Sequence, residues 1–400
     1  MTLPLIVYRS LRQHALSTLV TAASLALAAG MLMTVWAVKN QSQRAFTETT
    51  TGFDAVLAAR GSKLQIVLNA IFHLEASPGN LPYSEYERIK RDPRIKAAIP
   101  IAVGDNFYGW RIVGTLPELF TSVEYAPGRA HHFASGTVFD PETKQAVVGS
   151  FIAQKLKWKV GDTFKPFHGL AFDPNNQHQD LYTITGVLAA TNTPADRVIW
   201  IPLKGLQTMT GHDPRAATDV SAVLIQLRAP TAGFMLDMMY NKQGDKFTLA
   251  WPVGAMITDL FNKIGWFDRV LALVAYLVAL VAAGSVLASI YASMNARRRD
   301  IAILRALGAR RRTIFGAVVA EAGTIGVLGS FGGFFVYFAL LTGVAGVIRA
   351  QTGVVLQVFA WHPILWICPL AMITLGALGG VVPAIKAYRT PVAETLAPIS

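Results

Sequence analysis

The chain has almost no cysteine and little charge. Only Cys368 occurs among the 400 residues, and it lies in an apolar run, so no disulfide can form within the chain. Charged residues make up 15% of the sequence, whereas hydrophobic residues make up 52% and the mean hydropathy is +0.40. These values argue against an ordinary soluble domain and are typical of a membrane protein with an attached polar part.

Motifs for common enzymatic chemistry are also absent. No G-x-x-x-x-G-K-[S/T] motif occurs, and the nearest fragment, 60–63, lacks the first glycine and the required spacing. No H-E-x-x-H motif, G-x-S-x-G motif or cysteine pair is present either. We therefore predict that the chain is not an enzyme and holds no cofactor. Any energy from ATP must enter through a partner subunit that binds ATP and Mg²⁺.

The long apolar runs lack ionisable residues. Ala15–Val38, Val270–Met294 and Ile364–Val382 contain no Asp, Glu, Lys, Arg or His, and Ile314–Ile348 contains only Glu321. Because pathways for ions and polar solutes usually need such groups, the runs favour helices that transmit movement over a conducting pore. Glu321 either pairs with an arginine of the basic segment described next or lies at the depth of the lipid headgroups.

Most of the positive charge flanks these runs. The formal net charge is +12, and Ala296–Thr313 alone holds seven arginines against one acid. Arg9 and Arg12 precede the first run, and Lys386 and Arg389 follow the last. Because positively charged loops stay on the cytoplasmic side, we expect both termini and the basic segment in the cytoplasm. The membrane topology accounts for the positive net charge, so we do not predict nucleic-acid binding.

The basic segment has the pattern of a short helix that docks on a partner. Its centre, Asp300–Leu307, contains neither glycine nor proline, and Gly308 follows where a left-handed C-cap residue is expected. Ile301, Leu304 and Gly308 fall on one face, with Ile303 beside them. An apolar stripe between arginines suits a groove on another protein. The alternative is a topology loop whose arginines contact lipid headgroups, but such a loop needs no ordered helix.

The segment RRRDIAILRALGARRRTIFGAVVAEA resembles the cytoplasmic coupling helix of the MacB/LolC/FtsX permeases, the mechanotransmission (type VII) ABC transporters. The tail Gly379–Leu396, GGVVPAIKAYRTPVAETL, is similar to the closing motif of that family. The resemblance implies that the helix fits a cleft in a separate ABC ATPase subunit, present in two copies. The residues assigned to this contact are Arg298, Asp300, Ile301, Leu304, Arg305, Leu307 and Gly308.

Length and hydropathy predict four spans in the inner (plasma) membrane. As a straight helix the third run would reach ~52 Å, too long for one bilayer, so we expect one tilted or broken helix with bends at its glycines. The predicted segments are a cytoplasmic N-terminal segment (1–14), span 1 (15–38), an extracytoplasmic domain (39–268), span 2 (269–294), the coupling-helix loop (295–313), span 3 (314–348), an outer loop (349–361), span 4 (362–385) and a cytoplasmic tail (386–400).

The polar block 39–268 alternates strand-like and helix-like patterns. Ser84 and Glu87 have the spacing of a capping box and predict a helix over 84–91. A split pair of α/β units with a β-rich insertion resembles the periplasmic core of the same family and implies an inserted subdomain at about 116–218.

The predicted fold class is an α+β membrane protein: four transmembrane helices, with a large extracytoplasmic α/β domain of two subdomains (a MacB-like periplasmic core) between helices 1 and 2. The expected strands include 95–103, 108–113, 182–189, 198–202 and 220–227.

Small residues recur at four-residue intervals on two spans. Ala22, Ala26 and Gly30 form such a stripe on the first, and Gly284 and Ala288 form one on the second. Stripes of this kind let helices approach closely, and we expect them to pack against a second permease copy, in a homodimer or a heterodimer. The other expected partners are membrane lipids and a periplasmic adaptor or lipoprotein.

Five histidines of the polar block are candidate metal ligands, namely His73, His131, His132, His168 and His178. A metal site needs three or four converging ligands, and these residues show no familiar spacing. The sequence therefore predicts no metal site.

Three functions fit these features. The first is a permease subunit that couples ATP hydrolysis in a partner to movements of the outer domain, for export or extraction of a lipoprotein, lipid, peptide or efflux substrate. The second is an FtsX-like signal transducer that regulates a periplasmic partner such as a cell-wall hydrolase. The third is a membrane-anchored binding protein without an ATPase.

Overall fold

The computed structural model describes residues 3–48, 52–212, 217–296, 298–306, 308–352 and 355–389. The chain forms two compact units, each considered by itself. The helical unit comprises Met1–Gln41, Gly265–Gly346 and Gln357–Ser400, and the α/β unit comprises Ser42–Ile264 and Val347–Leu356.

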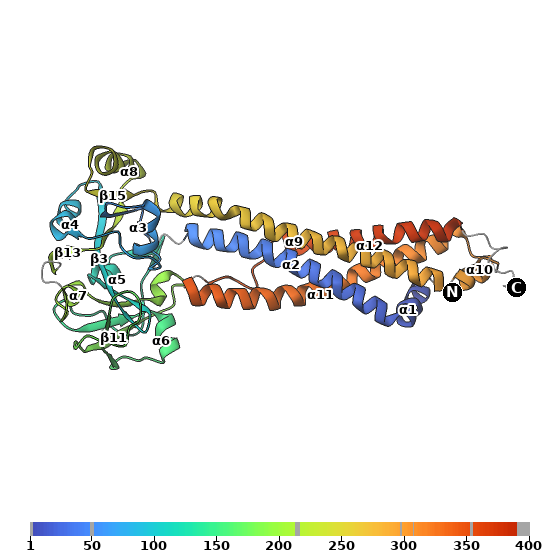
Figure 1. Cartoon of the computed structure of the whole chain (residues 1–400), viewed down its shortest axis with the longest axis horizontal. Coiled ribbons are helices and arrows are strands. Elements are labelled where there is room, and N and C mark those ends of the chain that lie inside the picture. Colours follow the sequence, from blue (N-terminus) through green and yellow to red (C-terminus); the bar gives the residue numbers. More distant parts are fainter. Residues whose placement is uncertain are drawn as a thin grey trace. The chain divides into compact units, whose positions relative to one another are not determined.

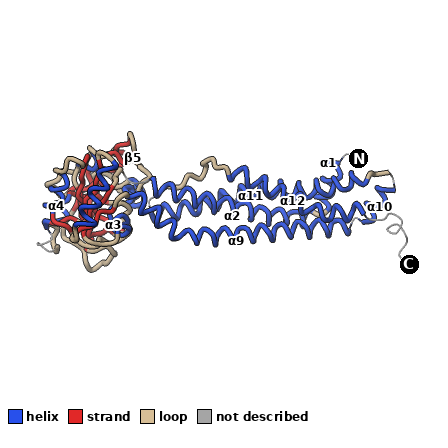
Figure 2. Tube along the Cα trace, turned by 90° about the horizontal axis from the view of Figure 1, so that it is seen from above, coloured by secondary structure: helices blue, strands red, loops and turns tan. Residues whose placement is uncertain are grey.

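Among the described residues, four helices are long and apolar enough to cross a membrane, which confirms the predicted number of spans. Their apolar portions are Ala15–Gln43, Arg269–Asn295, Arg311–Thr352 and Ile364–Lys386. In Figure 2 helices α2, α9, α11 and α12 run side by side. The helices of this unit are α1 (Leu3–Gln13), α2 (Ala15–Glu48), α9 (Val253–Ala296, which begins in the α/β unit), α10 (Arg298–Ala306), α11 (Arg311–Thr352) and α12 (Ile364–Arg389).

Helix α11 continues through all of its glycines, so the expected single long helix is confirmed and the glycines do not break it. Several of them are sites of close packing instead. A Cβ atom on Gly329 would lie 2.5 Å from Leu25 Cβ of α2, and one on Gly326 would lie 3.0 Å from Ile373 Cα of α12. Side chains larger than hydrogen at these positions would therefore separate the helices.

The first small-residue stripe packs against α11 of the same chain, and its contact with a second copy stays a prediction. Ala26 and Gly30 are buried, and a Cβ atom on Gly30 would lie 2.5 Å from Val336 Cβ of α11. The backbone oxygen of Ala22 likewise lies 3.2 Å from the Cβ position of Gly329. Four-residue spacing shows that a close helix neighbour exists, but it does not show to which chain that neighbour belongs.

The second small-residue stripe, on α9, is exposed. Gly284 and Ala288 are exposed on α9, and no atom lies within 4 Å of the Cβ position of Gly284. Their contact with a second copy therefore stays a prediction.

The α/β unit is built on an 11-stranded sheet with the strand order β15-β1-β14-β3-β4-β12-β8-β11-β7, to which β10 and β9 are added beside β3 and β11. Its strands are β1 (Ala55–Ala59), β3 (Ile95–Phe107), β4 (Trp110–Thr115), β7 (Phe133–Gly136), β8 (Gln145–Val148), β9 (Thr163–Phe164), β10 (Phe167–His168), β11 (Tyr182–Leu188), β12 (Ile199–Pro202), β14 (Ala222–Leu227) and β15 (Phe247–Ala250). Four short strands pair outside it: β2 (Leu81–Pro82), β5 (Glu124–Ala126), β6 (Arg129–Ala130) and β13 (Asp219–Val220).

The long strand β3 joins two halves of this sheet. Its first part, from Ile95 to Ile101, pairs with β14, and its second part, from Ala102 to Phe107, pairs with β4. The first and last portions of the domain thus build one half, and its middle portion builds the other. Strand β4 already belongs to the second half, so that half begins before the residue near 116 that the sequence suggested.

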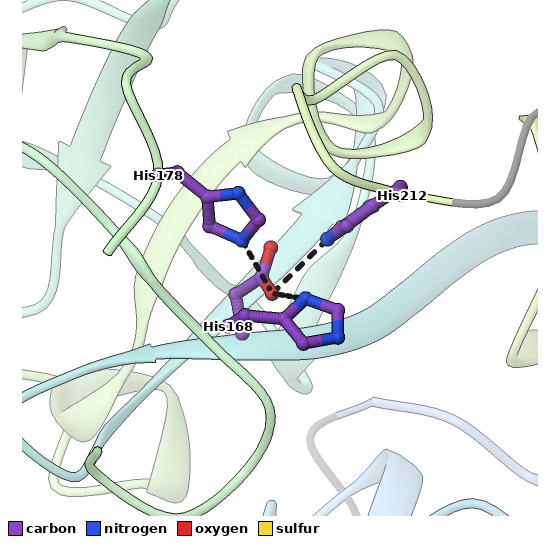
Figure 3. Close-up of side chains that lie close together, drawn as sticks. His168, His178 and His212 are labelled. Atoms are coloured by element: carbon purple, nitrogen blue, oxygen red, sulfur yellow. Dashed lines mark hydrogen bonds and ion pairs between the residues drawn. The ribbon is translucent and has the colours of Figure 1, made fainter. Parts of the chain in front are cut away.

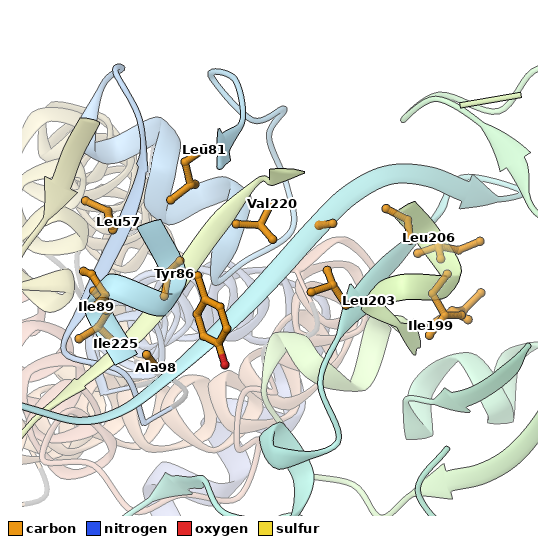
Figure 4. Close-up of a cluster of buried hydrophobic side chains, with 14 of the residues drawn as sticks. Leu57, Leu81, Tyr86, Ile89, Ala98, Ile199, Leu203, Leu206, Val220 and Ile225 are labelled. Carbon is orange, nitrogen blue, oxygen red and sulfur yellow. The ribbon is translucent and has the colours of Figure 1, made fainter. Parts of the chain in front are cut away.

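Both faces of the sheet are buried. Neighbouring residues alternate between two hydrophobic clusters: Leu57 and Val223 belong to one, whereas Val56 and Leu224 belong to the other. This alternation is the two-residue period of a strand, so the clusters lie on opposite faces. Figure 4 shows the first of them.

Short helices cover the two faces. Ile89 of α4 lies in the first cluster, and Val67 of α3 lies in the second. The predicted helix at 84–91 is confirmed as α4, but Pro82 is its N-cap and no side chain caps it, so the capping box does not form. The helices are α3 (Lys63–Ala70), α4 (Tyr83–Lys90), α5 (Glu118–Thr121), α6 (Ser150–Leu156), η1 (Pro194–Arg197), α7 (Leu203–Gln207), α8 (Pro230–Asp237) and η3 (Met238–Gln243).

Candidate functional site

The basic segment forms an ordered helix, α10, at one end of the helical unit, where α1 also lies (Figure 1). Gly308 follows it with a φ of +99°, and its N–H donates to the carbonyl oxygen of Arg305 at 3.1 Å. The predicted helix and its left-handed C-cap are therefore confirmed. Of the residues assigned to the ATPase contact, Leu307 lies outside the described residues, as do the side chains of Arg298, Asp300 and Leu304.

The faces of α10 have different environments. Ala302 is buried, whereas Ile301 and Arg305 are half-buried. Ile303 is 42% exposed, and Arg299 is exposed one turn before it. A four-residue interval places Arg299 and Ile303 on one face, so this helix presents an apolar side chain and an arginine outward. The sequence-based assignment did not include Ile303, although its apolar character next to Leu304 was visible in the sequence.

Aromatic and basic side chains of the closing segment hold the two helices that flank α10. Lys386 of α12 donates a hydrogen bond to the hydroxyl of Tyr291 near the end of α9, and its ammonium group lies 4.2 Å from the centre of that ring. The guanidinium carbon of Arg311, at the start of α11, lies 5.5 Å from the ring centre of Tyr388 on α12. Cation–π contacts of this kind add to the attraction between the helices, so the C-terminal end of α12 stabilises the ends of α9 and α11 that flank α10.

Helix α1 is attached to the same part of the unit. The hydroxyl of Ser10 donates a hydrogen bond to Glu321 of α11. The one acidic residue of the third run thus accepts a hydrogen bond from α1. Arg9 and Arg12 of α1 are exposed, so this end of the helical unit carries arginines from α1, α10 and the start of α11.

Two histidines of the α/β unit have strongly lowered pKa values. Burial, together with the nearby guanidinium of Arg111, lowers the pKa of His73 to about 3. Burial also lowers the pKa of His131 to about 4, with His132 contributing. His73 and His131 are therefore neutral at physiological pH.

His168 and His178 instead meet a third histidine, His212, around the carboxylate of Asp105. Within the described residues this is the one group of His, Cys, Asp and Glu side chains close enough to hold a metal ion. Sequence spacing gave no sign of this group, because its members are separated by 10 to 107 positions and meet only in the folded sheet.

Two family models match the chain. One describes the MacB-like periplasmic core domain and covers residues 17–233, and the other describes the FtsX-like permease C-terminal region and covers 272–392. Together with the four membrane-length helices, these matches define a multi-pass membrane protein with an extracellular α/β domain. The chain belongs to the MacB/LolC/FtsX family of ABC transporter permeases.

Solved structures provide two further similarities. The extracellular domain of the noncanonic ABC-type transporter YknZ from Gram-positive bacteria is 14% identical, with a TM-score of 0.31 over 48% of this chain and 97% of that one. The periplasmic region of MacB from Actinobacillus actinomycetemcomitans is 11% identical, with a TM-score of 0.35 over 53% of this chain and 94% of that one. A search of curated proteins finds no match to this chain.

Proposed function

We propose that this chain is the permease subunit of a mechanotransmission complex, in which α10 docks on a separate ABC ATPase subunit. The observation that carries the proposal is the ordered α10 helix, which exposes Ile303 beside Arg299 at the arginine-rich end of the helical unit. An exposed apolar side chain with basic neighbours suits a groove on a partner protein. ATP and Mg²⁺ are bound by that partner, and this chain carries out no chemistry itself.

Two long helices could carry the movement. Helix α9 extends over 44 residues and α11 over 42, about twice the ~20 residues that a bilayer requires. Both flank α10 in the sequence. Tyr291 of α9 and Arg311 of α11 each contact a side chain of α12. A displacement of α10 by the ATPase would therefore act on a supported group of helices rather than on a loose loop. The work is done outside the cytoplasm, on a lipoprotein, lipid, peptide or efflux substrate.

Reconstitution tests this function. When the chain is purified from the membranes of its own cells, an ABC ATPase subunit should copurify with it, and the chain should stimulate ATP hydrolysis by that subunit in lipid nanodiscs. ATPase activity that is the same with and without the chain would contradict the proposal, and purification without any ATP-binding subunit would favour a membrane-anchored binding protein.

An FtsX-like signal transducer shares this architecture and differs in what the outer domain binds. Capture of partners from the envelope with the full-length chain distinguishes the two functions. Recovery of a cell-wall hydrolase supports the transducer, whereas recovery of an adaptor or lipoprotein supports a transporter.

The exposed stripe on α9 predicts the contact between two permease copies. In a chain that carries Cys368→Ala, a cysteine introduced by Ala288→Cys should form a disulfide-linked dimer in the membrane under mild oxidation. Tyr276→Cys serves as the control, because Tyr276 is also exposed on α9 but lies three turns away. Equal cross-linking at both positions, or none at Ala288→Cys, would show that α9 meets no second copy through this stripe.

A further inference from the structure

Four side chains that commonly bind metals meet at one point of the α/β unit. Asp105 lies on β3, His168 lies on β10, His178 follows β10, and His212 follows α7. Oxygen Oδ1 of Asp105 lies 3.5 Å from His168 Nδ1, 3.3 Å from His178 Nε2 and 3.2 Å from His212 Nε2. Figure 3 shows the three imidazole rings pointing toward one another.

The three separations from Asp105 Oδ1 match edges of a tetrahedral metal site. Zinc binds imidazole nitrogen and carboxylate oxygen at roughly 2.0–2.1 Å, which places neighbouring ligand atoms about 3.3 Å apart in a tetrahedron. The three distances from Asp105 Oδ1 lie close to this value, and all four ligand atoms lie within 4.8 Å of one another. As direct hydrogen bonds the same distances would be long, because N–H···O bonds are usually about 2.9–3.0 Å.

The orientation of two histidines favours a cation between them and Asp105. His178 Nδ1 lies 2.6 Å from the backbone oxygen of Thr210, and His212 Nδ1 lies 2.9 Å from that of Leu206. Because a carbonyl oxygen only accepts, each Nδ1 carries the hydrogen, and a neutral ring then presents the lone pair of Nε2 to the carboxylate. Two such lone pairs facing an anionic oxygen repel it unless a positive charge lies between them. Histidine ligands of zinc usually donate their other nitrogen to a carbonyl or carboxylate in this way.

The buried carboxylate of Asp105 also has one oxygen without a partner in the described part of the chain. Protonation of the three histidines would not account for it. Asp105 is fully buried, and its oxygen Oδ2 has no hydrogen-bond partner among the described residues. A buried carboxylate with a free oxygen is unfavourable unless its charge is neutralised nearby. Three imidazolium rings, with centres 5.0–5.3 Å apart, would neutralise it only by repelling one another. One divalent ion binds all four groups without that repulsion.

An ion can reach the site from outside. The side chain of His168 is 55% exposed, whereas those of His178 and His212 are 5% and 14% exposed. His168 and His212 also line an open cavity of about 330 Å³, together with Gly104 and Asp219. The more buried ligands thus lie on the protein side of the site, and His168 lies on its solvent side.

We propose that Asp105, His168, His178 and His212 bind one Zn²⁺-class ion in the α/β unit. Three imidazoles and one carboxylate suit a borderline transition metal in tetrahedral geometry, while Ca²⁺ and Mg²⁺ prefer sites made of oxygen ligands. The ion fastens three segments to one another: β3, the segment around β10, and the segment after α7. This site does not depend on the coupling function of α10, so either proposal can fail while the other stands.

The test uses the full-length chain, purified in detergent and freed of metal with a chelator. Titration with ZnCl₂ against a chromophoric chelator should show one tight site per chain. His178→Gln and His212→Gln should each weaken binding by more than about 100-fold, since loss of even an outer-shell partner of a metal ligand weakens binding 10- to 100-fold. His132→Gln is the matched control, because His132 is an exposed histidine of the same unit that lies outside the group.

A second measurement does not depend on variants that fold. Co²⁺ added to the metal-free wild-type chain should give the intense visible absorption of tetrahedral cobalt, and Zn²⁺ should remove it. Zn²⁺ should also raise the unfolding temperature of the wild-type chain, because an ion that binds only the folded state stabilises it. A wild-type chain that binds less than about a tenth of an equivalent of Zn²⁺, a weak octahedral cobalt spectrum, or variants that bind as tightly as the wild type would each overturn the proposal.

Discussion

Ile303→Asp in α10 should abolish stimulation of the partner ATPase while the chain still folds and inserts into the membrane. Ile303 is 42% exposed and lies on the same face of α10 as the exposed Arg299, so the substitution disturbs little internal packing. Burying such a side chain in a partner contributes roughly 1.5–3 kcal/mol, so its loss weakens docking about 10- to 100-fold, before the added desolvation of a carboxylate is counted. ATPase rates in nanodiscs, measured as the permease concentration is varied, report this directly.

Three further variants separate docking from folding. Ile303→Leu keeps the apolar surface and should retain stimulation. Leu304→Asp, chosen from the apolar stripe of the sequence, should uncouple the complex in the same way. Tyr388→Ala removes the ring beneath Arg311 and should reduce stimulation without preventing complex formation. If Ile303→Asp stimulated the ATPase as well as the wild type, the outward face of α10 could not be the contact.

The parts of this molecule that could be predicted from sequence are those encoded locally. Apolar runs of membrane length identified the four candidate spanning helices, because a bilayer imposes length and hydropathy on each segment separately. The segment before Gly308 formed the expected helix because its residues favour that conformation and glycine alone adopts the left-handed cap easily. Helix α4 formed where predicted, but Pro82 took the N-cap position, so the spacing of Ser84 and Glu87 had no capping role.

What could not be predicted depends on contacts between distant segments. The stripe of Ala22, Ala26 and Gly30 indicated a close neighbour, but α11 of the same chain fills that place. The histidine group is the stronger example. His212 was not among the residues weighed as ligands, and Asp105 stood in a strand-like segment like any other acid. Their convergence follows from the pairing of β10 with β3, which no spacing in the sequence reveals.

Gly30→Leu should destabilise the helical unit, because α2 and α11 meet there without room for a side chain. A Cβ atom on Gly30 would lie 2.5 Å from both Cβ and Cγ1 of Val336, and one on Gly333 would lie 2.7 Å from Ala29 Cβ. Forcing extra carbon atoms into a packed contact destabilises a protein by about 1–3 kcal/mol. In a membrane, close packing is itself a main source of attraction between helices, so its loss is not offset by hydrophobic burial. We expect a lower unfolding temperature in detergent, less monodisperse protein and a loss of ATPase coupling.

Gly343→Leu is the matched control for this prediction. Gly343 lies on the same helix, α11, is exposed, and has no atom within 4 Å of its Cβ position. The same change in size and helix propensity is therefore made where no neighbour is displaced, and the unfolding temperature should stay near that of the wild type. The pair isolates the contact between α2 and α11 from any general effect of adding leucine to a membrane helix. Equal unfolding temperatures for Gly30→Leu and Gly343→Leu would mean that α2 and α11 do not pack at Gly30, and the stripe on α2 would again be available to a second copy.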